Sequence, residues 1–438
     1  MDFEVLRQYY NLCDPKESLE PDDARNVDLD SAGVRGSNWA PKMTREILLS
    51  DRPSCRFFTG LPGTGKSTEL KRLAGLMKEK GLFPVLINAE EVLDLHNPID
   101  ATEVLATLVF KTEEAVLAAK KKDPANAMVD GYLTRLWDWL KNTDFVLGKG
   151  NFSLPGGPGK LMIEMKTRPA LRARIRETVS ANFVHFLAEV RQEIDQLNKQ
   201  IKDEGHEGLI IILDSLEKLR GNTDTWDQVM SSAERLFSDG AAYLRLPVHV
   251  VYTVPATLVT RMPGLDFLPM IKVITPDGES WAQGIKAARH MIRQRIPDEV
   301  LNALMGPDRA ETEARISRLI RWSGGYPRQM MQLLRAIIAE EQHPVSEKVF
   351  HRQLIHLTNE YSEMVPGEAY PWLARVHAEK KLVIEDDDHR RIAGRMLANH
   401  VVLRYMNDTL WFDLHPAVLT ISGVQSAIDT LGDKDASP

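Results

Sequence analysis

The stretch "FFTGLPGTGKSTEL", residues 57–70, decides the fold. From Gly60 to Ser67 it matches the pattern G-x-x-x-x-G-K-[S/T] at every fixed position. Glycines let backbone N–H groups turn inward, and the following helix adds a favourable dipole at its N-terminus. The stretch therefore predicts a loop that cradles a phosphate chain.

The sequence around this loop supplies the elements that a phosphate loop needs. Residues 55–59 are apolar enough for a buried strand, and residues 83–89 form the next apolar run, after Gly81. Between them, apolar residues recur with the spacing of a helix face: Leu70, Leu73, Ala74 and Met77. Strand, loop, helix and strand follow in the required order, which makes a chance match in a surface loop a poor explanation.

Each polar residue of the loop has a predicted role. Lys66 is expected to neutralise the β- and γ-phosphates, and the Ser67 hydroxyl is suited to ligate Mg²⁺. The residues predicted to bind nucleotide are Gly60, Leu61, Pro62, Gly63, Thr64, Gly65, Lys66, Ser67 and Thr68. A second glycine cluster, residues 154–161, lacks the first glycine and the final Ser or Thr, so we interpret it as a turn or an interaction loop.

An acidic partner follows a second apolar run, "GLIIILDSLEKL", residues 208–219. Five apolar residues, 209–213, are typical of a central parallel strand that is buried on both faces. Asp214 then stands at the carboxyl end of that strand, where ligands of open α/β sheets bind, and is predicted to orient Mg²⁺. Glu217 is a candidate to polarise the attacking water; a solvated glutamate at a helix start is the alternative.

Two more strands are predicted downstream. The run 248–256 ends near Thr253, whose hydroxyl is a candidate contact for the γ-phosphate or the attacking water. The alternative is a β-favouring threonine at the end of a strand. Residues 270–276 are predicted to form a final parallel strand.

Length and composition bound the architecture. The 438 residues are too many for one core and suggest two to three domains. A net charge of −7 argues against a mainly electrostatic grip on nucleic acid, and two cysteines exclude a disulfide framework and fit a reducing, cytoplasmic setting. We see no signal peptide and no apolar run of membrane-spanning length.

A helical lid is predicted behind the sheet, at residues 280–296, 311–322 and 329–340. The sequence "SGGYPR", residues 323–328, separates the last two helices, with a Gly pair ending one and Pro327 opening the next. Pro327 is a candidate contact for the nucleotide base and Arg328 for its phosphates. An ordinary helix–helix turn is the alternative.

The region from about residue 345 suggests a winged-helix-like module. We expect a helix and short strand in "PWLARVHAEKKLVI", a helix capped by Asp387 or Asp388, and a hairpin turning at Asn407-Asp408. Neighbouring charges of both signs leave two partners open, DNA or protein. They are Arg390, Arg391, Arg395 and Arg404 on one side and residues 385–388 on the other.

A long helical insertion is predicted between the second and third strands. One apolar stripe runs from Ile175 to Leu197 on what we expect to be a single helix, with core packing as the main interpretation and a partner groove as the alternative. Three arginines are expected to form a solvated face or to reach a neighbouring subunit's site: Arg172, Arg174 and Arg176.

The predicted organisation is therefore α/β, a P-loop NTPase parallel sheet of the RecA or AAA+ kind followed by a lid and a winged-helix-like domain. The expected parts are an N-terminal extension (1–30), the ATPase core (31–278, with the insertion at about 100–205), the lid (279–344), the winged-helix-like domain (345–425) and a loose tail (426–438).

Taken together, these motifs resemble the STAND and AAA+ group of P-loop ATPases, closest to initiator-type and NACHT-like bacterial members. The resemblance covers about residues 30–340 and is carried by the P-loop, the Asp214 strand, the strand ending at Thr253 and "SGGYP". It implies ATP with Mg²⁺ as the ligand, Pro327 near the adenine and Arg328 as a second sensor. Lys218 stands where many relatives carry a second acidic residue, which implies slow hydrolysis.

Three functions follow as hypotheses. The first is an ATP-dependent switch whose nucleotide state controls a homo-oligomer or a separate effector protein, in bacterial defence or stress signalling. The second is a DNA-binding AAA+ ATPase of the initiator or transposition-helper type. The third is a small-molecule kinase, against which the lid motif and the large C-terminal region stand.

Overall fold

The computed structural model describes residues 1–29, 32–36, 38–120, 166–221, 224–262, 264–406 and 409–435. The chain divides into two compact units, each built from more than one segment. The sheet unit contains residues 40–59 and 70–266. The lid unit contains residues 1–39, 60–69 and 267–438, so the phosphate loop belongs to it.

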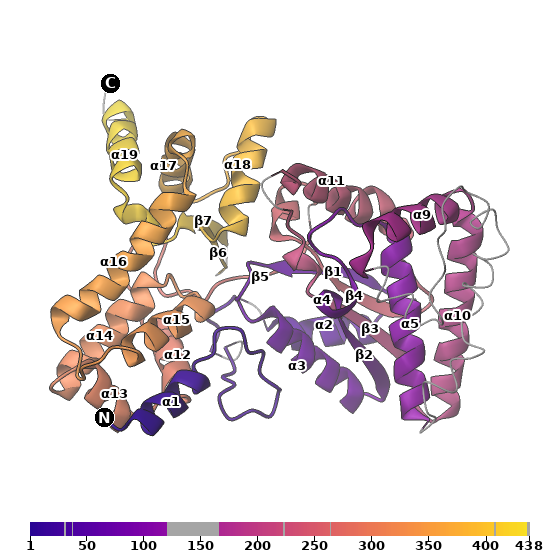
Figure 1. The fold of residues 1–438 in the computed structure, drawn as a ribbon, viewed down its shortest axis with the longest axis horizontal. Coiled ribbons are helices and arrows are strands. Elements are labelled where there is room, and N and C mark those ends of the chain that lie inside the picture. Colours follow the sequence, from indigo (N-terminus) through magenta and orange to yellow (C-terminus); the bar gives the residue numbers. More distant parts are fainter. Residues whose placement is uncertain are drawn as a thin grey trace. The chain divides into compact units, whose positions relative to one another are not determined.

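A five-stranded sheet with the order β2-β3-β4-β1-β5 forms the centre of the sheet unit (Figure 1). The pairs β2–β3, β3–β4 and β1–β4 are parallel, which confirms the predicted parallel α/β architecture. The strands are β1 (Cys55–Gly60), β2 (Leu82–Asn88), β3 (Gly208–Asp214), β4 (His249–Thr253) and β5 (Asp266–Leu268). All seven residues of β3 are buried, as expected for a central parallel strand.

The prediction of a final strand at residues 270–276 is wrong, because β5 lies earlier, at Asp266–Leu268. The backbone of the predicted segment bonds elsewhere within the lid unit. Met270 N donates to the Arg404 carbonyl, Ile271 N to Gly325 and Lys272 N to Val34. An apolar run predicts burial, but here the N–H partners come from three separate segments, of which only Arg404 lies in a strand, the β6 strand (Val402–Met406) of the other sheet.

Helices α5 and α10 pack against each other and against the strands β2 and β3 (Figure 1). The predicted apolar stripe is buried in the core of this unit, so the core interpretation is confirmed. It does not lie on one helix, since the chain breaks at Ala181-Asn182 between α9 and α10. The helices of this unit are α2 (Trp39–Leu48), α3 (Lys66–Glu79, beginning in the other unit), α4 (Ala89–Val92), α5 (Ala101–Ala119), α9 (Pro169–Ser180), α10 (Phe183–Asp203) and α11 (Trp226–Phe237), with short 3₁₀ turns η3 (Leu216–Lys218), η4 (Asp239–Ala242) and η5 (Ala256–Thr260).

Two arginines of α9 form ion pairs within the chain, and the predicted solvated face is wrong for Arg172, which is buried. Arg172 pairs with Asp94 at 2.9 Å, and Arg176 donates to Glu103 at 2.6 Å. Both bonds tie α9 to the start of α5 and the segment before it. The side chain of Arg174 and the glycine cluster 154–161 lie outside the described residues.

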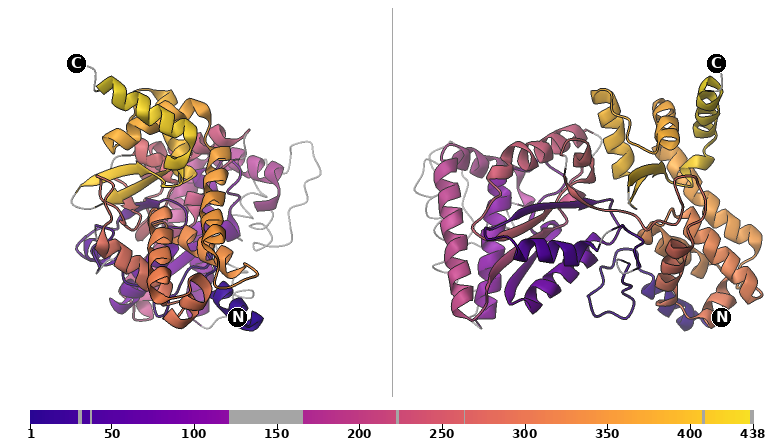
Figure 2. Two further views of the ribbon diagram at one scale, coloured as in Figure 1. Left: turned by 90° about the vertical axis from the view of Figure 1, so that its left-hand side faces the viewer. Right: turned by 180° about the vertical axis from the view of Figure 1, so that it is seen from behind.

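The lid unit begins with α1 (Phe3–Leu12), which packs against the lid helix α15 (Figure 2). Its apolar core joins residues of the N-terminal segment, including Cys13, Leu29 and Val34, to the lid helices. The helical lid occurs where it was predicted, with one additional short helix, α13. Its helices are α12 (Ala282–Arg293), α13 (Asp298–Met305), α14 (Arg309–Trp322) and α15 (Pro327–Ile338).

The C-terminal module contains helices α16 (Glu347–Met364), α17 (Tyr370–Glu379), α18 (Asp387–Ala398) and α19 (Ser422–Asp435). Strands β6 (Val402–Met406) and β7 (Leu410–Leu414) pair antiparallel, which confirms the predicted hairpin; its turn residues lie outside the described ones. Short 3₁₀ turns η6 (Gly367–Ala369) and η7 (Val418–Thr420) complete the module.

Three details of this module differ from the predictions. No strand forms at residues 382–384, which the structure describes as irregular chain. The N-cap of α18 is Asp386, which accepts from His389 N, because it is the residue with extended backbone before the first turn. The expected loose tail is helical to Asp435, since α19 packs against α17.

Within the described part of the chain, no helix is both long and apolar enough to cross a membrane.

Candidate phosphate-binding site

The phosphate loop connects the end of β1 at Gly60 to the start of α3 at Lys66. Gly63 and Gly65 have φ values of 83° and 98°, which side chains rarely allow. The Thr64 backbone N–H and hydroxyl both donate to the Leu61 carbonyl, at 3.3 and 3.0 Å. The loop is thus a tight backbone turn at a helix N-terminus, the arrangement that binds anions.

The Lys66 side chain is folded back over its own loop. Its Nζ donates to the carbonyls of Gly60 and Leu61, at 3.0 and 3.1 Å, and the residue is buried. Ser67 and Thr68 are half-buried in the first turn of α3. The only cation among the nine predicted loop residues therefore lies at the turn that the phosphate chain would enter.

Four side chains from distant parts of the lid unit surround this loop, and we call them the collar: Arg35, Tyr326, Arg328 and His400. Arg35 is buried and donates through Nη2 to the Thr64 carbonyl, at 2.6 Å. Its Nη1 lies 3.8 Å from a carboxylate oxygen of Glu69 in the first turn of α3. Arg35 thus fixes both the loop and the helix that follows it.

Two collar residues hold one carbonyl of the loop. The Tyr326 hydroxyl donates to the Pro62 carbonyl at 2.7 Å, and His400 Nε2 lies 2.9 Å from the same oxygen. The two rings stack with centroids 4.8 Å apart. A carbonyl has two lone pairs, so it can accept from both side chains when His400 carries its proton on Nε2.

Sequence reasoning found Arg328 but missed the other collar residues. Tyr326 stands inside the motif that the sequence singled out, yet its type suggested no role. His400 lies 338 positions from Pro62, between α18 and β6, and no local pattern marks it. Its φ of 59°, unusual for a residue other than glycine, is a signal that only the structure provides.

The predicted lid residues lie at the start of α15. Pro327 is its first residue, where a missing N–H costs nothing, and Arg328 follows. Arg328 stands against the phosphate loop, because a methyl group on Gly63 would lie 2.7 Å from both its Cβ and its Nε. The base contact predicted for Pro327 stays a prediction.

The paired glycines before Tyr326 are required by both conformation and space. Gly324 and Gly325 have φ values of 60° and 74°. A Cβ on Gly325 would lie 1.8 Å from the Ile271 carbonyl oxygen, and the Gly324 carbonyl accepts from the Tyr405 hydroxyl at 2.7 Å. The turn is therefore held between the segment after β5 and the strand β6.

The acidic candidates lie in the sheet unit, at the end of β3 and in the turn that follows it. Asp214 is the last residue of this strand and is level with Asn88, the last residue of β2. It is buried, and Oδ1 accepts from Ser215 N at 2.6 Å. Glu217 is also buried, in η3, so it is not the solvated glutamate of the alternative interpretation.

Thr253 ends β4 and ties two strand ends together. Its hydroxyl donates to the Leu213 carbonyl at 3.3 Å and accepts from Leu216 N at 2.9 Å. The single proton of this hydroxyl is therefore used within the sheet unit, and the side chain is fully buried. A contact between Thr253 and a phosphate or water stays a prediction.

Lys218, which replaces an acidic residue expected from the resemblance, forms an ion pair with Glu90 of α4. The pair is partly exposed, and it joins η3 to the end of β2 through α4. The position therefore carries a structural cation in this chain and provides no second carboxylate.

The phosphate loop and the acidic candidates follow strands of one parallel sheet, with β4 between them. Phe58 of β1 is level with Thr253, and Tyr252 is level with Leu213, the residue before Asp214. Gly60 is the last residue of β1, and Asp214 is the last residue of β3.

No model of a known protein family matches this sequence. No curated protein matches it either. Solved structures that are similar to this chain include a Walker-type ATPase of Pyrococcus abyssi, with 12% identity, a TM-score of 0.39 and coverage of 95% of this chain and 99% of that one. The ORC2 protein of Aeropyrum pernix in its ADP form has 12% identity, a TM-score of 0.40 and 98% coverage of both chains. Cdc6p from Pyrobaculum aerophilum has 11% identity, a TM-score of 0.30 and coverage of 96% of this chain and 98% of that one.

Proposed function

We propose that this chain is a P-loop ATPase of the AAA+ kind that works as a switch. ATP with Mg²⁺ binds at the loop 60–68 and is hydrolysed slowly, and its state sets the assembly of the chain or the activity of a partner protein. The observation that carries the proposal is the collar. The loop that would grip the phosphates is bonded directly to the lid through Tyr326 and to the C-terminal module through His400.

The residues present fit a magnesium nucleotide. A backbone turn with two positive-φ glycines opens at a helix N-terminus, and it carries a buried lysine. The Ser67 hydroxyl and the Asp214 carboxylate would hold Mg²⁺, which would supply positive charge to the phosphates. Arg328 would add a second positive charge from the lid side.

Slow turnover follows from the acidic side of the site. Glu217 is the candidate that orients the attacking water, and no second acidic residue follows it, because the next position is Lys218, which pairs with Glu90. A nucleotide that is held tightly and cleaved slowly suits a switch, since each state persists long enough to be sensed. A role in bacterial defence or stress signalling rests on the resemblance in sequence alone.

A DNA-binding ATPase is the second candidate, favoured by the order of α17, α18 and the hairpin β6–β7. The charges of the module weaken it. Arg391 pairs with Asp388 at 2.8 Å, Arg390 lies 3.5 Å from Asp387, and Arg404 is buried between the rings of Phe267 and Phe412. Arg404 is therefore no surface cation, and Arg390 and Arg391 are partly neutralised, whereas Arg395 is exposed and remains a candidate contact for a DNA phosphate.

The test compares the wild type with Lys66→Ala, each sized in solution with ATP, with ADP and with neither. We expect the wild type to retain an adenine nucleotide and to change its size or its partner binding between ATP and ADP, and Lys66→Ala to do neither. An identical profile under all conditions contradicts the switch. Salt-sensitive binding of duplex DNA that needs the C-terminal module would favour the second candidate instead.

A further inference from the structure

Arg328 has an unusual environment for a lid arginine. Its Nε donates to the backbone carbonyl of Pro15, at 3.2 Å, in the N-terminal segment. Among the residues that the structure describes, no carboxylate forms an ion pair with it. Within this described part of the chain no carboxylate compensates its positive charge, and its Cβ and Nε lie beside Gly63, on a loop built for anions.

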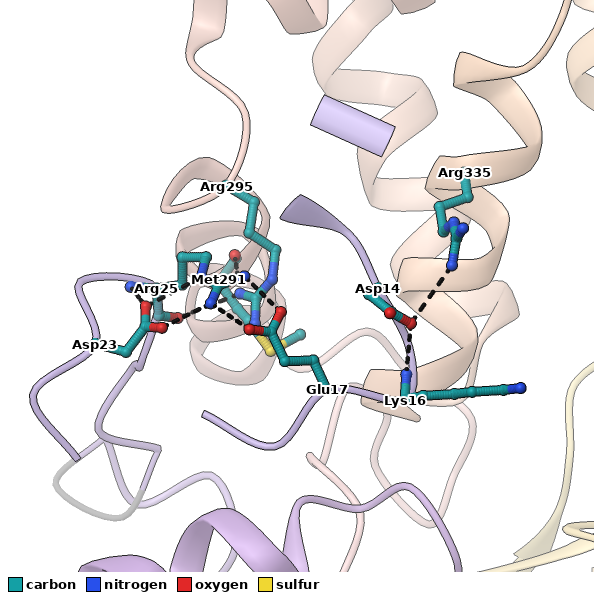
Figure 3. A network of polar contacts seen from close by, with 8 residues as sticks. All are labelled: Asp14, Lys16, Glu17, Asp23, Arg25, Met291, Arg295 and Arg335. Atoms are coloured by element: carbon teal, nitrogen blue, oxygen red, sulfur yellow. Dashed lines mark hydrogen bonds and ion pairs between the residues drawn. The ribbon is translucent and has the colours of Figure 1, made fainter. Parts of the chain in front are cut away.

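The Pro15 carbonyl orients Arg328, and the chain before Pro15 is held in place by Arg335 of α15. The Arg335 guanidinium lies over the ring of Tyr10, 3.8 Å from its centroid. It also lies 3.5 Å from the carboxylate of Asp14 (Figure 3). Asp14 also accepts from Lys16 N, at 3.0 Å, so it braces both flanks of Pro15. Cys13, the residue before Asp14, is fully buried in the lid core.

A second anchor holds the segment on the other side of Pro15 (Figure 3). Arg25 donates two hydrogen bonds to Glu17, both 2.7 Å, and bonds Asp23, which lowers the pKa of that carboxyl to about 2. Arg295, which follows the end of α12, then donates to the Arg25 carbonyl at 3.2 Å and to the carbonyl of Met291 in α12 at 2.9 Å. The segment is therefore clamped to two different lid helices.

A backbone carbonyl is a suitable partner for an arginine that must bind phosphate. It fixes the plane of the guanidinium through Nε but leaves the charge uncompensated, whereas a carboxylate would neutralise it. The two terminal nitrogens keep the parallel donor geometry that matches phosphate oxygens. The environment of Arg328 thus combines a fixed orientation with an available charge.

We propose that residues 3–29 form a strap that orients Arg328 toward the terminal phosphate of the bound nucleotide. Arg328 is the residue that contacts the phosphate, while Tyr10, Asp14 and Arg335 are positioning residues that hold the Pro15 carbonyl. This inference rests on the proposed function, because it needs ATP at the phosphate loop. It assigns to the N-terminal extension a part in distinguishing ATP from ADP.

The test is a double-mutant cycle of Arg328→Ala and Arg335→Ala in the full chain, read as the dissociation constants of ATP and of ADP with Mg²⁺. Arg328→Ala should weaken ATP binding by about 10- to 100-fold and ADP binding by less than about threefold, since a charge-assisted bond to the γ-phosphate is lost. Arg335→Ala should shift the ATP/ADP ratio in the same direction by about threefold to tenfold. The double variant should be no worse than Arg328→Ala.

Variants of Tyr10 separate positioning from folding. Tyr10→Phe keeps the ring beneath Arg335 and should bind both nucleotides like the wild type, whereas Tyr10→Ala should lower the preference for ATP. Arg7→Ala is the matched control, because Arg7 is an exposed arginine of the same helix whose ion pair is with exposed Glu4. It should leave both dissociation constants unchanged. Thermal melts of every variant show whether it is folded.

Two results would overturn the strap. One is an equal loss of ATP and ADP affinity in the strap variants, which a purely structural role predicts, and the other is additive losses in the double variant. If the wild type binds neither nucleotide, the proposed function fails and the strap fails with it. If the wild type binds ATP, Lys66→Ala does not, and the strap variants match the wild type, only the strap is wrong.

Discussion

The carboxyl edge of the sheet and the collar around the phosphate loop are built in opposite ways. At the sheet edge, each candidate residue lies at the end of an apolar strand or in the turn just after it. A few neighbouring residues in the sequence therefore determine its place. The collar brings Arg35, Tyr326 and His400 to a single short loop from three remote segments. The comparison teaches that the position of a residue at a strand end can be inferred from sequence, whereas the contacts that couple a loop to remote modules cannot.

The largest expected effect comes from the turn that carries Tyr326 into the collar. Gly325→Ala should destabilise the protein by about 4 kcal/mol or more, because its Cβ would meet the Ile271 carbonyl oxygen at a φ of 74°. Urea unfolding of both proteins measures this difference. Gly278→Ala is the matched control, since Gly278 has a φ of 83° but no atom within 4 Å of an added Cβ. It should cost only about 1–2 kcal/mol, and equal losses would show that conformation alone explains Gly325.

The sequence predicted the strands and the loop because their signals are short. Four apolar runs became β1 to β4, and the G-K-S pattern became a turn with two positive-φ glycines. The fifth strand was misplaced, since residues 270–276 are apolar and extended but bond to Val34, Gly325 and Arg404. Apolar character predicts burial there, while the choice of backbone partner depends on the tertiary fold.

The collar escaped prediction for the same physical reason. A tyrosine in a turn and a histidine after a helix have no fixed role until the fold brings a carbonyl within reach. Arg328 was found because it follows a recognisable glycine-proline motif. Its partner, the Pro15 carbonyl, is a backbone atom, and sequence patterns carry no information about which backbone atom a side chain will reach.

A smaller effect is expected from the buried histidine of the C-terminal module. Burial lowers the pKa of His415 to about 3, so the folded protein keeps it neutral while the unfolded chain takes up a proton below about pH 6.5. The unfolded state binds more protons in this window, and stability should fall as the pH drops from 6.5 toward 3. The contribution is about 2 kcal/mol between pH 6.5 and pH 5.

The check is urea unfolding at both pH values for the wild type and His415→Asn. An asparagine oxygen can accept from Ala417 N, as His415 Nδ1 does at 3.1 Å, but it does not titrate. The variant should therefore lose less stability on acidification than the wild type. An identical pH slope in the two proteins would show that His415 is not neutral in the folded state or is not the group that titrates.

The smallest effect concerns one hydrogen bond of the collar. Tyr326→Phe removes a donor from the Pro62 carbonyl and leaves His400 as its partner, so it should cost about 1 kcal/mol of stability. The substitution should also weaken ATP binding by about threefold to tenfold, because the loop is less preorganised.

Tyr405→Phe is the matched comparison for this variant. The Tyr405 hydroxyl also donates to a lid-unit carbonyl at 2.7 Å, but that carbonyl belongs to Gly324 and not to the phosphate loop. We expect a similar loss of stability and no change in ATP affinity. If both variants weaken ATP binding equally, the collar has no specific influence on the phosphate loop.

The central proposal is that the phosphate loop and Asp214 act on one magnesium nucleotide. The most direct measurement is the dissociation constant of ATP, with and without Mg²⁺, for the wild type, Lys66→Ala and Asp214→Asn. Lys66→Ala should bind at least tenfold more weakly under both conditions, since a charge on the phosphates is lost. Asp214→Asn should match the wild type without Mg²⁺ and lose most of the affinity that Mg²⁺ adds. A wild type that binds no ATP, or an Asp214→Asn variant with the full gain from Mg²⁺, would contradict the claim.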